Sequence, residues 1–323
     1  MAEKKPLLSI VVPIYMEQDI IAEFYNRLKA ALLKIALGFD YEMMFVNDGS
    51  TDRTAEMLKE ICAEDAAVKV INFSRNFGHQ IAITAGIDHA EGDAVIVMDA
   101  DLQDPPEIIP QMVSKWKEGY NVVYCVRSKR KGENRLKVFF AAVFYRIISK
   151  LSDTKLPLAT GDFRLMDRRV VNALKSMREG NRYIRGLVAW IGFSQCALNY
   201  ERDPRYAGEP KYRFRQSLRL AMDGIASFSE KPLIISSFMG VLFTVISFIA
   251  ALDIIISKLL NPQSTIQGWA SLMVVVLFIG GIQLMSLGIM GMYIGRVYRE
   301  MKQRPLYIIA DKIGFSSGVN GKS

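Results

Sequence analysis

The stretch that decides the fold is VMDADLQDPPE, residues 97–107. An apolar, β-prone run, residues 94–98, delivers Asp99 and Asp101 directly after what we predict to be a buried strand. In an open α/β sheet, ligands bind at the carboxyl ends of the strands. Two carboxylates at such an end offer the hard oxygen ligands that a divalent cation needs, commonly shared with substrate phosphates. The stretch therefore predicts an α/β sheet with a cation site at this edge.

Further strands and helices alternate around this stretch up to about residue 126. Between the strand-like runs lie amphipathic segments of helical length, such as residues 51–64. Alternation of this kind indicates a mostly parallel sheet that is covered by helices on both faces. The predicted strands are residues 8–14, 41–46, 68–73, 94–98 and 122–126.

Composition narrows the class of protein. The chain has 323 residues, of which 50% are hydrophobic, and a net charge of +8. Its three cysteines show no paired spacing, so we expect neither a disulfide framework nor a zinc site, which suits a reducing compartment. This positive charge could bind either nucleic acid or an anionic membrane surface. The basic residues gather beside apolar segments and no nucleic-acid-binding motif accompanies them, so the membrane reading is favoured.

Two long apolar segments, residues 233–256 and 270–294, are each long enough to cross a bilayer, which takes about 20 apolar helical residues. The first contains one charged residue, Asp253, and the second contains none. A buried helical hairpin in a soluble protein is the alternative interpretation. The length of both segments and the short connection between them favour two transmembrane helices.

The basic residues predict the orientation of these helices. Four precede Pro232 within twenty residues and four follow the second segment, whereas the connecting loop has only Lys258. By the positive-inside rule, both termini and the α/β domain face the cytoplasm, and the loop lies outside. Gly291 and Gly295 are spaced for helix–helix contact, which would suit a homo-oligomer. The eight basic residues are Arg213, Arg215, Arg219, Lys231, Arg296, Arg299, Lys302 and Arg304.

Two further segments combine basic and apolar residues. Residues 135–152 and 211–231 are helical in composition, and we expect amphipathic helices on the membrane surface, with ordinary core helices as the alternative. The predicted organisation is a catalytic domain over residues 1–210, a juxtamembrane helix over 211–231, a transmembrane hairpin over 232–298 and a cytoplasmic tail over 299–323.

Polar residues close four successive predicted strands. They are PIYME at residues 13–17, VNDGSTD at 46–52, FSRNFGH at 73–79, and the Asp99 and Asp101 segment. Asp-Gly-Ser alone is usually a turn with helix-capping residues. Four such ends in succession would line one crevice.

With these motifs the chain resembles the family 2 glycosyltransferases with the GT-A fold, and within them the bacterial polyprenyl-phosphate glycosyltransferases of the GtrB type. The resemblance covers nearly the whole chain. It rests on IVVPIYME (10–17), VNDGS (46–50), SRNFG (74–78), DADLQDPP (99–106), TGDFRLMDR (160–168) and YIGRVY (293–298).

The resemblance implies an inverting enzyme that moves a hexose, expected to be glucose, from a UDP-sugar to undecaprenyl phosphate at the cytoplasmic face of a bacterial inner membrane. It implies a role for Asp101, with Asp99, in holding Mg²⁺ or Mn²⁺. A cation that bridges the diphosphate would stabilise the charge of the leaving UDP. The residues implied to hold the nucleotide-sugar are Pro13, Tyr15, Glu17, Asp48, Asp99, Ala100 and Asp101.

For the acceptor side, the resemblance implies Asp162 as the catalytic acidic residue. A phosphate monoester is mostly ionised at neutral pH, so Asp162 is expected to act as a base, to orient the acceptor or to complete the metal site. Arg127, Arg205 and Lys211 would bind the acceptor phosphate, for which arginine offers a planar fork of donors.

Several alternatives stay open. Related enzymes use 4-formamido-arabinose, N-acetylhexosamine or mannose, and a non-enzymatic scaffold for a flippase is the alternative from another class. A flippase partner and a tetramer are compatible with the resemblance. A Gly-x-Gly dinucleotide motif and the Gln-x-x-Arg-Trp signature of processive synthases do not occur in the sequence.

Overall fold

The computed structural model describes residues 5–127, 160–180, 182–200, 231–260 and 268–315. These fall into two compact units. The described residues up to 200, together with residues 305–315, make the first unit, and the described residues from 231 to 304 make the second. The predicted surface helix at 135–152 and nearly all of the juxtamembrane segment at 211–231 lie outside the described residues.

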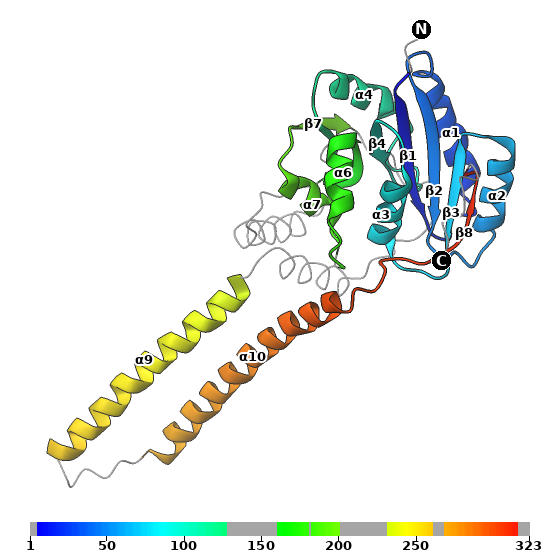
Figure 1. Ribbon diagram of the computed structural model, residues 1–323. Coiled ribbons are helices and arrows are strands. Elements are labelled where there is room, and N and C mark those ends of the chain that lie inside the picture. The colour runs from blue at the N-terminus through cyan, green and yellow to red at the C-terminus, as the bar shows by residue number, and fades with distance from the viewer. Residues whose placement is uncertain (1–4, 128–159, 181, 201–230, 261–267, 316–323) are drawn as a thin grey trace, which may run out of the picture. The chain divides into compact units, whose positions relative to one another are not determined.

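The described part of the first unit contains an eight-stranded sheet in the order β7-β5-β6-β4-β1-β2-β3-β8 (Figure 1). Strands β1 to β4 run parallel, β5 and β7 run parallel to each other, and β6 and β8 run antiparallel to their neighbours. The predicted α/β class with a mostly parallel sheet is therefore confirmed. The bounds are β1 Leu7–Ile14, β2 Asp40–Asn47, β3 Val68–Phe73, β4 Ala94–Val97, β5 Val122–Arg127, β6 Thr160–Asp167, β7 Gln195–Tyr200 and β8 Ile309–Ile313.

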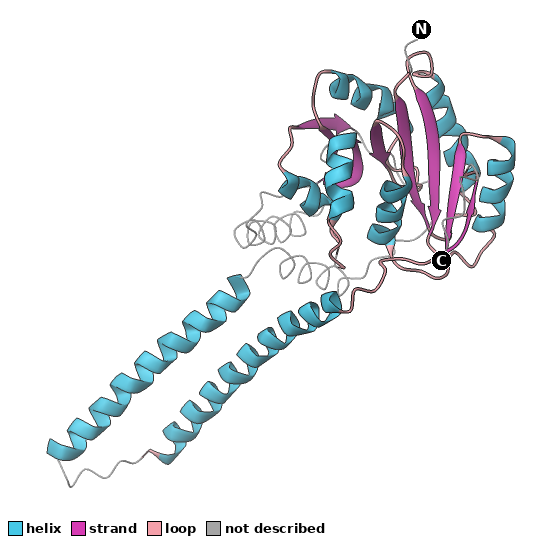
Figure 2. Ribbon diagram, viewed as in Figure 1, coloured by secondary structure: helices cyan, strands magenta, loops and turns pink. Residues whose placement is uncertain are grey.

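Helices cover both faces of this sheet (Figure 2). On one face, alternate residues of β1 such as Ile10 and Val12 pack with Phe24 and Leu28 of α1 in the main core. On the other face, α3 lies so close to β1 that a Cβ on Gly86 would meet the Val11 side chain at 2.1 Å. The helices are α1 Ile21–Leu33, α2 Thr54–Glu64, α3 His79–His89, the short 3₁₀ helix η1 Pro106–Ile108, α4 Ile109–Lys117, α6 Arg168–Ser176 and α7 Ile184–Ile191.

The sequence predicted β1 to β5 but not β6, β7 or β8. In β6, Phe163 and Leu165 belong to the main core, whereas Asp162 and Arg164 alternate with them and face the side of α3. A strand with buried charged residues at alternate positions has no continuous apolar run, so its sequence does not show the pattern by which the other strands were predicted. In β7 only Tyr200 is buried and the other residues are partly buried or exposed, so the sequence signal for this strand is weak as well.

The strand β8 is made from residues that follow the second long apolar segment. It pairs with β3, where Asn72 Nδ2 donates to Asp311 Oδ2 at 2.9 Å. Just before β8, the Tyr307 ring stacks on Phe73 with centroids 5.3 Å apart, and its hydroxyl donates to Asp88 Oδ2 at 2.9 Å. The residues predicted to be a tail thus close one edge of the catalytic sheet.

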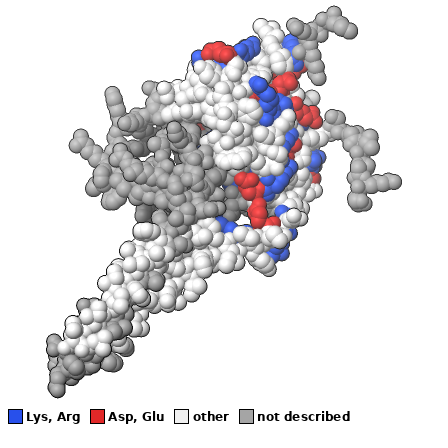
Figure 3. All heavy atoms as spheres, turned by 60° about the vertical axis from the view of Figure 1, so that its left-hand side comes forward, with Lys and Arg blue, Asp and Glu red and all other residues white. Residues whose placement is uncertain are grey.

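The second unit is a pair of long helices, α9 Lys231–Leu260 and α10 Trp269–Met301. They run antiparallel, since Ser236 Oγ donates to Ser286 Oγ at 2.8 Å and the Phe243 and Phe278 rings lie 5.4 Å apart. Both predicted apolar segments are therefore helical. Within the described residues, one stretch, Phe278–Met301, meets the criteria of length and composition for crossing a membrane. The described atoms of both helices carry few charged groups (Figure 3).

A buried ionic network holds the amino-terminal edge of the sheet. The Glu42 carboxylate accepts from Ser9 Oγ at 2.5 Å and from the Glu91 N–H at 2.9 Å, and Lys69 Nζ lies 2.6 Å away. Burial alone would raise the pKa of Glu42, but the Lys69 ammonium and these hydrogen bonds outweigh it and lower the pKa. Glu42 therefore stabilises the fold in its charged form.

We expect Glu42→Gln to lower the free energy of unfolding at pH 7 by about 2 kcal/mol, because the half-buried Lys69 then keeps only the more distant Glu91 carboxylate, 3.7 Å away, as its anion. Since folding lowers the pKa, this stabilisation is present above the ordinary glutamate pKa and is lost as pH falls through the lowered one. The thermal midpoints of wild type and variant should therefore stay apart from pH 7 down to the ordinary glutamate pKa of about 4.5 and converge only below it. The exposed Glu56, which pairs with Arg53 at 3.5 Å, supplies the control, and Glu56→Gln should leave the midpoint unchanged. A constant gap between wild type and Glu42→Gln at every pH would contradict this account.

The turn after β2 packs backbone against backbone on the loop after β3. Gly49 has φ +68°, and a Cβ there would lie 2.5 Å from the carbonyl carbon of Arg75 and 2.7 Å from the Asn76 nitrogen. Gly119 also has a positive φ, +101°, but nothing lies within 4 Å of its Cβ position.

Comparison of Gly49→Ala with Gly119→Ala separates backbone strain from close approach. Strain of this kind costs about 1 kcal/mol at either glycine. We expect a larger fall in the thermal midpoint for Gly49→Ala, because the loop after β3 must also move. Equal falls would show that this backbone contact contributes nothing to stability.

Candidate active site

The polar strand ends predicted from the sequence meet at one edge of the sheet. The strands β1 to β4 are parallel, so residues 15–17, Asp48, residues 74–79 and Asp99 all follow strands that end at this edge. Because β6 runs antiparallel to β4, its beginning lies at the same edge. Val97 pairs with Arg164, so continuing the register places Asp162 level with Asp99.

Hydrogen bonds join the loops after β1 and β2. The Met16 N–H donates to Ser50 Oγ at 2.9 Å, and the Glu17 N–H donates to Thr54 Oγ1 at 3.1 Å. The Tyr15 side chain is exposed and Glu17 is half-buried, whereas Pro13 is buried within β1. Pro13, Tyr15 and Glu17 were all predicted to hold the nucleotide. Of these three, Tyr15 and Glu17 have side chains that reach the open edge of the sheet.

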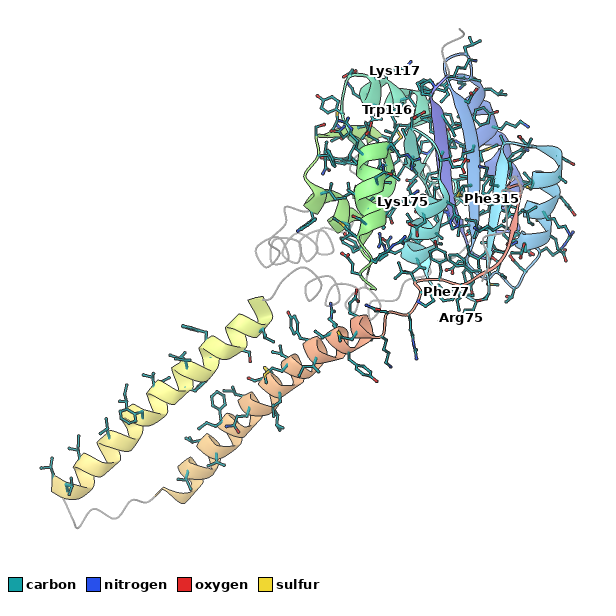
Figure 4. The ribbon with its side chains drawn as sticks, in the orientation of Figure 1. Arg75, Phe77, Trp116, Lys117, Lys175 and Phe315 are labelled. Carbon is teal, nitrogen blue, oxygen red and sulfur yellow. The ribbon has the colours of Figure 1, made fainter. Side chains whose placement is uncertain are left out.

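Asp48 binds the loop after β3. Its carboxylate accepts from the Phe77 N–H at 2.6 Å and from the Gly78 N–H at 2.9 Å. Burial raises the pKa of Asp48, and these two hydrogen bonds offset part of the rise. In the same loop the Arg75 guanidinium lies 4.1 Å from the centre of the Phe77 ring (Figure 4). In this structure Asp48 shapes the loop from which α3 begins.

The first residue of α3, His79, places its side chain beside the carboxylates of Asp99 and Asp162. His79 Nε2 lies 3.3 Å from Asp99 Oδ1 and 3.4 Å from Asp162 Oδ2. Burial would lower the pKa of His79, but the two carboxylates outweigh it and raise the pKa. His79 therefore brings positive charge between two acidic residues that lie far apart in the sequence.

Asp162 is buried in a set of donors. Arg185 forms a bidentate ion pair with it, in which Nε donates to Oδ1 at 2.8 Å and Nη2 donates to Oδ2 at 2.9 Å. Gln80 Nε2 also donates to Oδ2, at 3.1 Å. Burial would raise the pKa of Asp162, but Arg185 and His79 outweigh it and hold the pKa well below its usual range. A carboxylate with so low a pKa is a weak proton acceptor. Its geometry suits orientation and charge balance.

Near Asp162 on β6 lies a buried arginine, Arg164. Arg164 Nη2 donates to the Gly161 carbonyl at 3.0 Å, and burial lowers its pKa to about 10 against the opposing effect of Asp162. Arg164 thus adds a further cation near the Asp162 charge.

The two aspartates that follow β4 have different surroundings. Burial raises the pKa of Asp99 to about 6, where His79 opposes the rise and Asp162, Asp104 and Asp101 add to it. Asp99 Oδ1 is buried and accepts no hydrogen bond within the described part of the chain. Asp101 Oδ1 accepts from the Gln103 N–H at 3.1 Å, with Leu102 between them at φ +55°. Ala100, between the two aspartates, is buried.

The donor set suits a hard divalent cation that also binds a ligand. Among the described residues, no group of three or more His, Cys, Asp and Glu side chains is arranged to hold a metal. The buried Asp99 oxygen and the Asp101 carboxylate are two hard donors. Mg²⁺ is commonly bound through one or two carboxylates together with substrate phosphates, so the residues fit a cation that arrives with a diphosphate.

The predicted acceptor-phosphate residues are only partly placed. Arg127 is the last residue of β5, opposite Tyr200 of β7, at the same edge as Asp99. Arg205 and Lys211 lie outside the described residues.

Sequence reasoning assigned no role to His79, Gln80 or Arg185. His79 and Gln80 directly follow the SRNFG motif, so their place after a strand end was a usable signal. Arg185 stands 23 residues after Asp162 in no motif, and only the placement of α7 brings it to the site.

Comparison with known proteins supports the same family. A family model described as "Glycosyl transferase family 2" matches residues 9–175. An uncharacterized glycosyltransferase of Bacillus subtilis, YkcC, is 52% identical over 309 residues, which cover 96% of this chain and 95% of that protein. The SfII prophage-derived bactoprenol glucosyl transferase of Shigella flexneri is 40% identical over 304 residues, 94% of this chain and 97% of that protein. With a matching family model and relatives that align over nearly its full length, the chain belongs to glycosyl transferase family 2.

Proposed function

We propose that this protein transfers glucose from UDP-glucose to the phosphate of a polyprenyl phosphate, such as undecaprenyl phosphate, with inversion at the anomeric carbon. The observation that carries the proposal is the convergence of Asp99, Asp101 and Asp162 at the carboxyl edge of the sheet. The Shigella relative named as a bactoprenol glucosyl transferase, which aligns over nearly the whole chain, supports the donor sugar and the lipid acceptor.

Asp101 and Asp99 would hold Mg²⁺ or Mn²⁺. When bound, such a cation neutralises charge on the diphosphate of the leaving nucleotide. The chain's own residues supply the remainder of the site. Tyr15 and Glu17 would contact the nucleoside, and the main chain at Ala100 would lie beside the ribose. Pro13 and Asp48 would fix the loops around it.

Asp162 would orient the acceptor side rather than remove a proton. The acceptor phosphate is mostly ionised at neutral pH, and the ion pair with Arg185 keeps Asp162 charged. Arg127, Arg205 and Lys211 would bind the acceptor phosphate, where arginine can bond two oxygens at once.

The helices α9 and α10 would both cross the inner membrane, with the catalytic unit and both termini in the cytoplasm. Their length, the apolar character of the residues and the positive charge at both outer ends support this topology. Gly291 and Gly295 would offer a small-residue face for a homo-oligomer, and a flippase would move the lipid-linked product onward.

The central test is transfer by the purified full-length protein. With UDP-glucose, Mn²⁺ and undecaprenyl phosphate, we expect a lipid-linked glucose, measured as radiolabel that moves to the organic phase. A chelator should stop turnover. Asp101→Asn should lower kcat at least about a hundredfold, since an electrostatic contact to the leaving group is lost.

Glu118→Gln is the matched control, because Glu118 is an exposed acid whose partner is Lys115 at 2.8 Å, and it should retain full activity. A panel with other UDP-sugars identifies the preferred donor. No product from the wild type with any donor would refute the proposal and favour a non-enzymatic scaffold. Full turnover in chelator would refute the metal site.

The pH dependence of Asp162→Asn separates orientation from base catalysis. A positioning role predicts a loss of at least about a hundredfold in kcat that is the same at pH 6.5, 7.5 and 8.5. A base would be replaced in part by hydroxide or by fuller ionisation of the acceptor, so the loss would shrink as pH rises. Measurement of kcat for both proteins at the three pH values decides between them, and a loss that shrinks tenfold or more would contradict the orienting role.

A further inference from the structure

Gln80 uses both ends of its side-chain amide at the site. Its Nε2 donates to Asp162 Oδ2 at 3.1 Å, and its Oε1 accepts from the Ile184 N–H at 2.9 Å. The two partners lie 82 and 104 residues further along the chain. Gln80 therefore joins α3, β6 and α7 through one side chain.

The chemistry of the partners fixes the direction of this amide. A carboxylate as strongly ionised as Asp162 only accepts, and a main-chain N–H only donates. A flipped amide would set two acceptors against each other at Asp162 and two donors at Ile184. No other orientation satisfies both contacts.

The contact with Ile184 also completes the start of α7. Ile184 is the first residue of that helix, and the preceding Tyr183 provides no side-chain cap. The first N–H groups of a helix need an outside acceptor, and Gln80 supplies one. The next residue, Arg185, forks onto Asp162. Because Ile184 and Arg185 are joined by a peptide bond, the three contacts Gln80–Asp162, Asp162–Arg185 and Gln80–Ile184 form a closed ring.

We propose that Gln80 is a positioning residue for the transfer step, which sets the Asp162 carboxylate and the start of α7 in register with each other. This rests on the proposed function. Without Gln80, Asp162 keeps its ion pair with Arg185, but both are free to shift together because α7 loses its cap. Misplacement of a reacting group by about 1 Å costs on the order of a hundredfold in rate. Disruption of the ring is therefore expected to lower kcat.

The opposite end of α7 offers a matched control. Gln195 Nε2 donates to the Val188 carbonyl at 3.3 Å, so a second glutamine holds the same helix away from Asp162. Gln195→Ala loosens α7 without a direct effect on the carboxylate. Gln80→Glu is the informative variant: it keeps an acceptor for the Ile184 N–H but places a second carboxylate against Asp162.

The experiment compares Gln80→Ala, Gln80→Glu and Gln195→Ala in the full-length protein. Each is tested for kcat, for KM of UDP-glucose and undecaprenyl phosphate, and for amide hydrogen exchange over residues 184–187. We expect both Gln80 variants to lose at least about tenfold in kcat, with KM for UDP-glucose within about twofold. Exchange at Ile184 should rise in Gln80→Ala and stay near the wild-type rate in Gln80→Glu. Gln195→Ala should keep kcat within about twofold.

Two outcomes would overturn the role of Gln80. One is wild-type kcat in Gln80→Glu. The other is a loss in Gln195→Ala as large as that in Gln80→Ala, which would reduce Gln80 to general support of α7. Turnover by the wild type separates this inference from the proposed function: no product from the wild type overturns both, whereas normal wild-type product with unaffected Gln80 variants overturns the inference alone.

Discussion

A carboxylate held away from water is stable only where cations and hydrogen-bond donors surround it, and this requirement shapes the site around Asp162. Arg185 reaches it from α7, Gln80 and His79 reach it from α3, and the residue itself lies on β6. Each contact joins elements that are far apart in the sequence. The charge of one buried side chain thus determines how three elements meet at the edge of the sheet.

The antiparallel direction of β6 is what makes this meeting possible. A parallel strand in the same place would put Asp162 near the opposite edge, away from Asp99. Because β6 lies beside β4 in the opposite sense, acidic groups from two strands face the same region. Burial raises the pKa of Asp99, and the neighbouring carboxylates of Asp162, Asp104 and Asp101 add to the rise. The mutual repulsion favours any ligand that brings positive charge, which is the electrostatic requirement for a cation accompanied by a nucleotide diphosphate.

The sequence predicted those features that follow from local patterns. The apolar runs identified β1 to β5, and polar residues after them identified the loops at Tyr15, Asp48 and Asp99. The strand β6 escaped because Asp162 and Arg164 interrupt its apolar pattern, although the TGDFRLMDR motif had marked the segment as functional. Gln80 and Arg185 escaped because their roles depend on how α3 and α7 pack. Asp48 was expected at the nucleoside, and the structure shows its carboxylate bonded to the loop after β3.

The position of β8 in the chain has a consequence for biosynthesis. The ribosome completes α9 and α10 before it reaches Ile309, so the catalytic sheet remains one strand short while the long apolar helices are being made. During that interval the outer side of β3 presents unpaired main-chain groups, the feature by which sheets join to other chains. A polypeptide released from the ribosome before Pro305 would keep that edge open, and self-association along Val68–Phe73 would compete with folding.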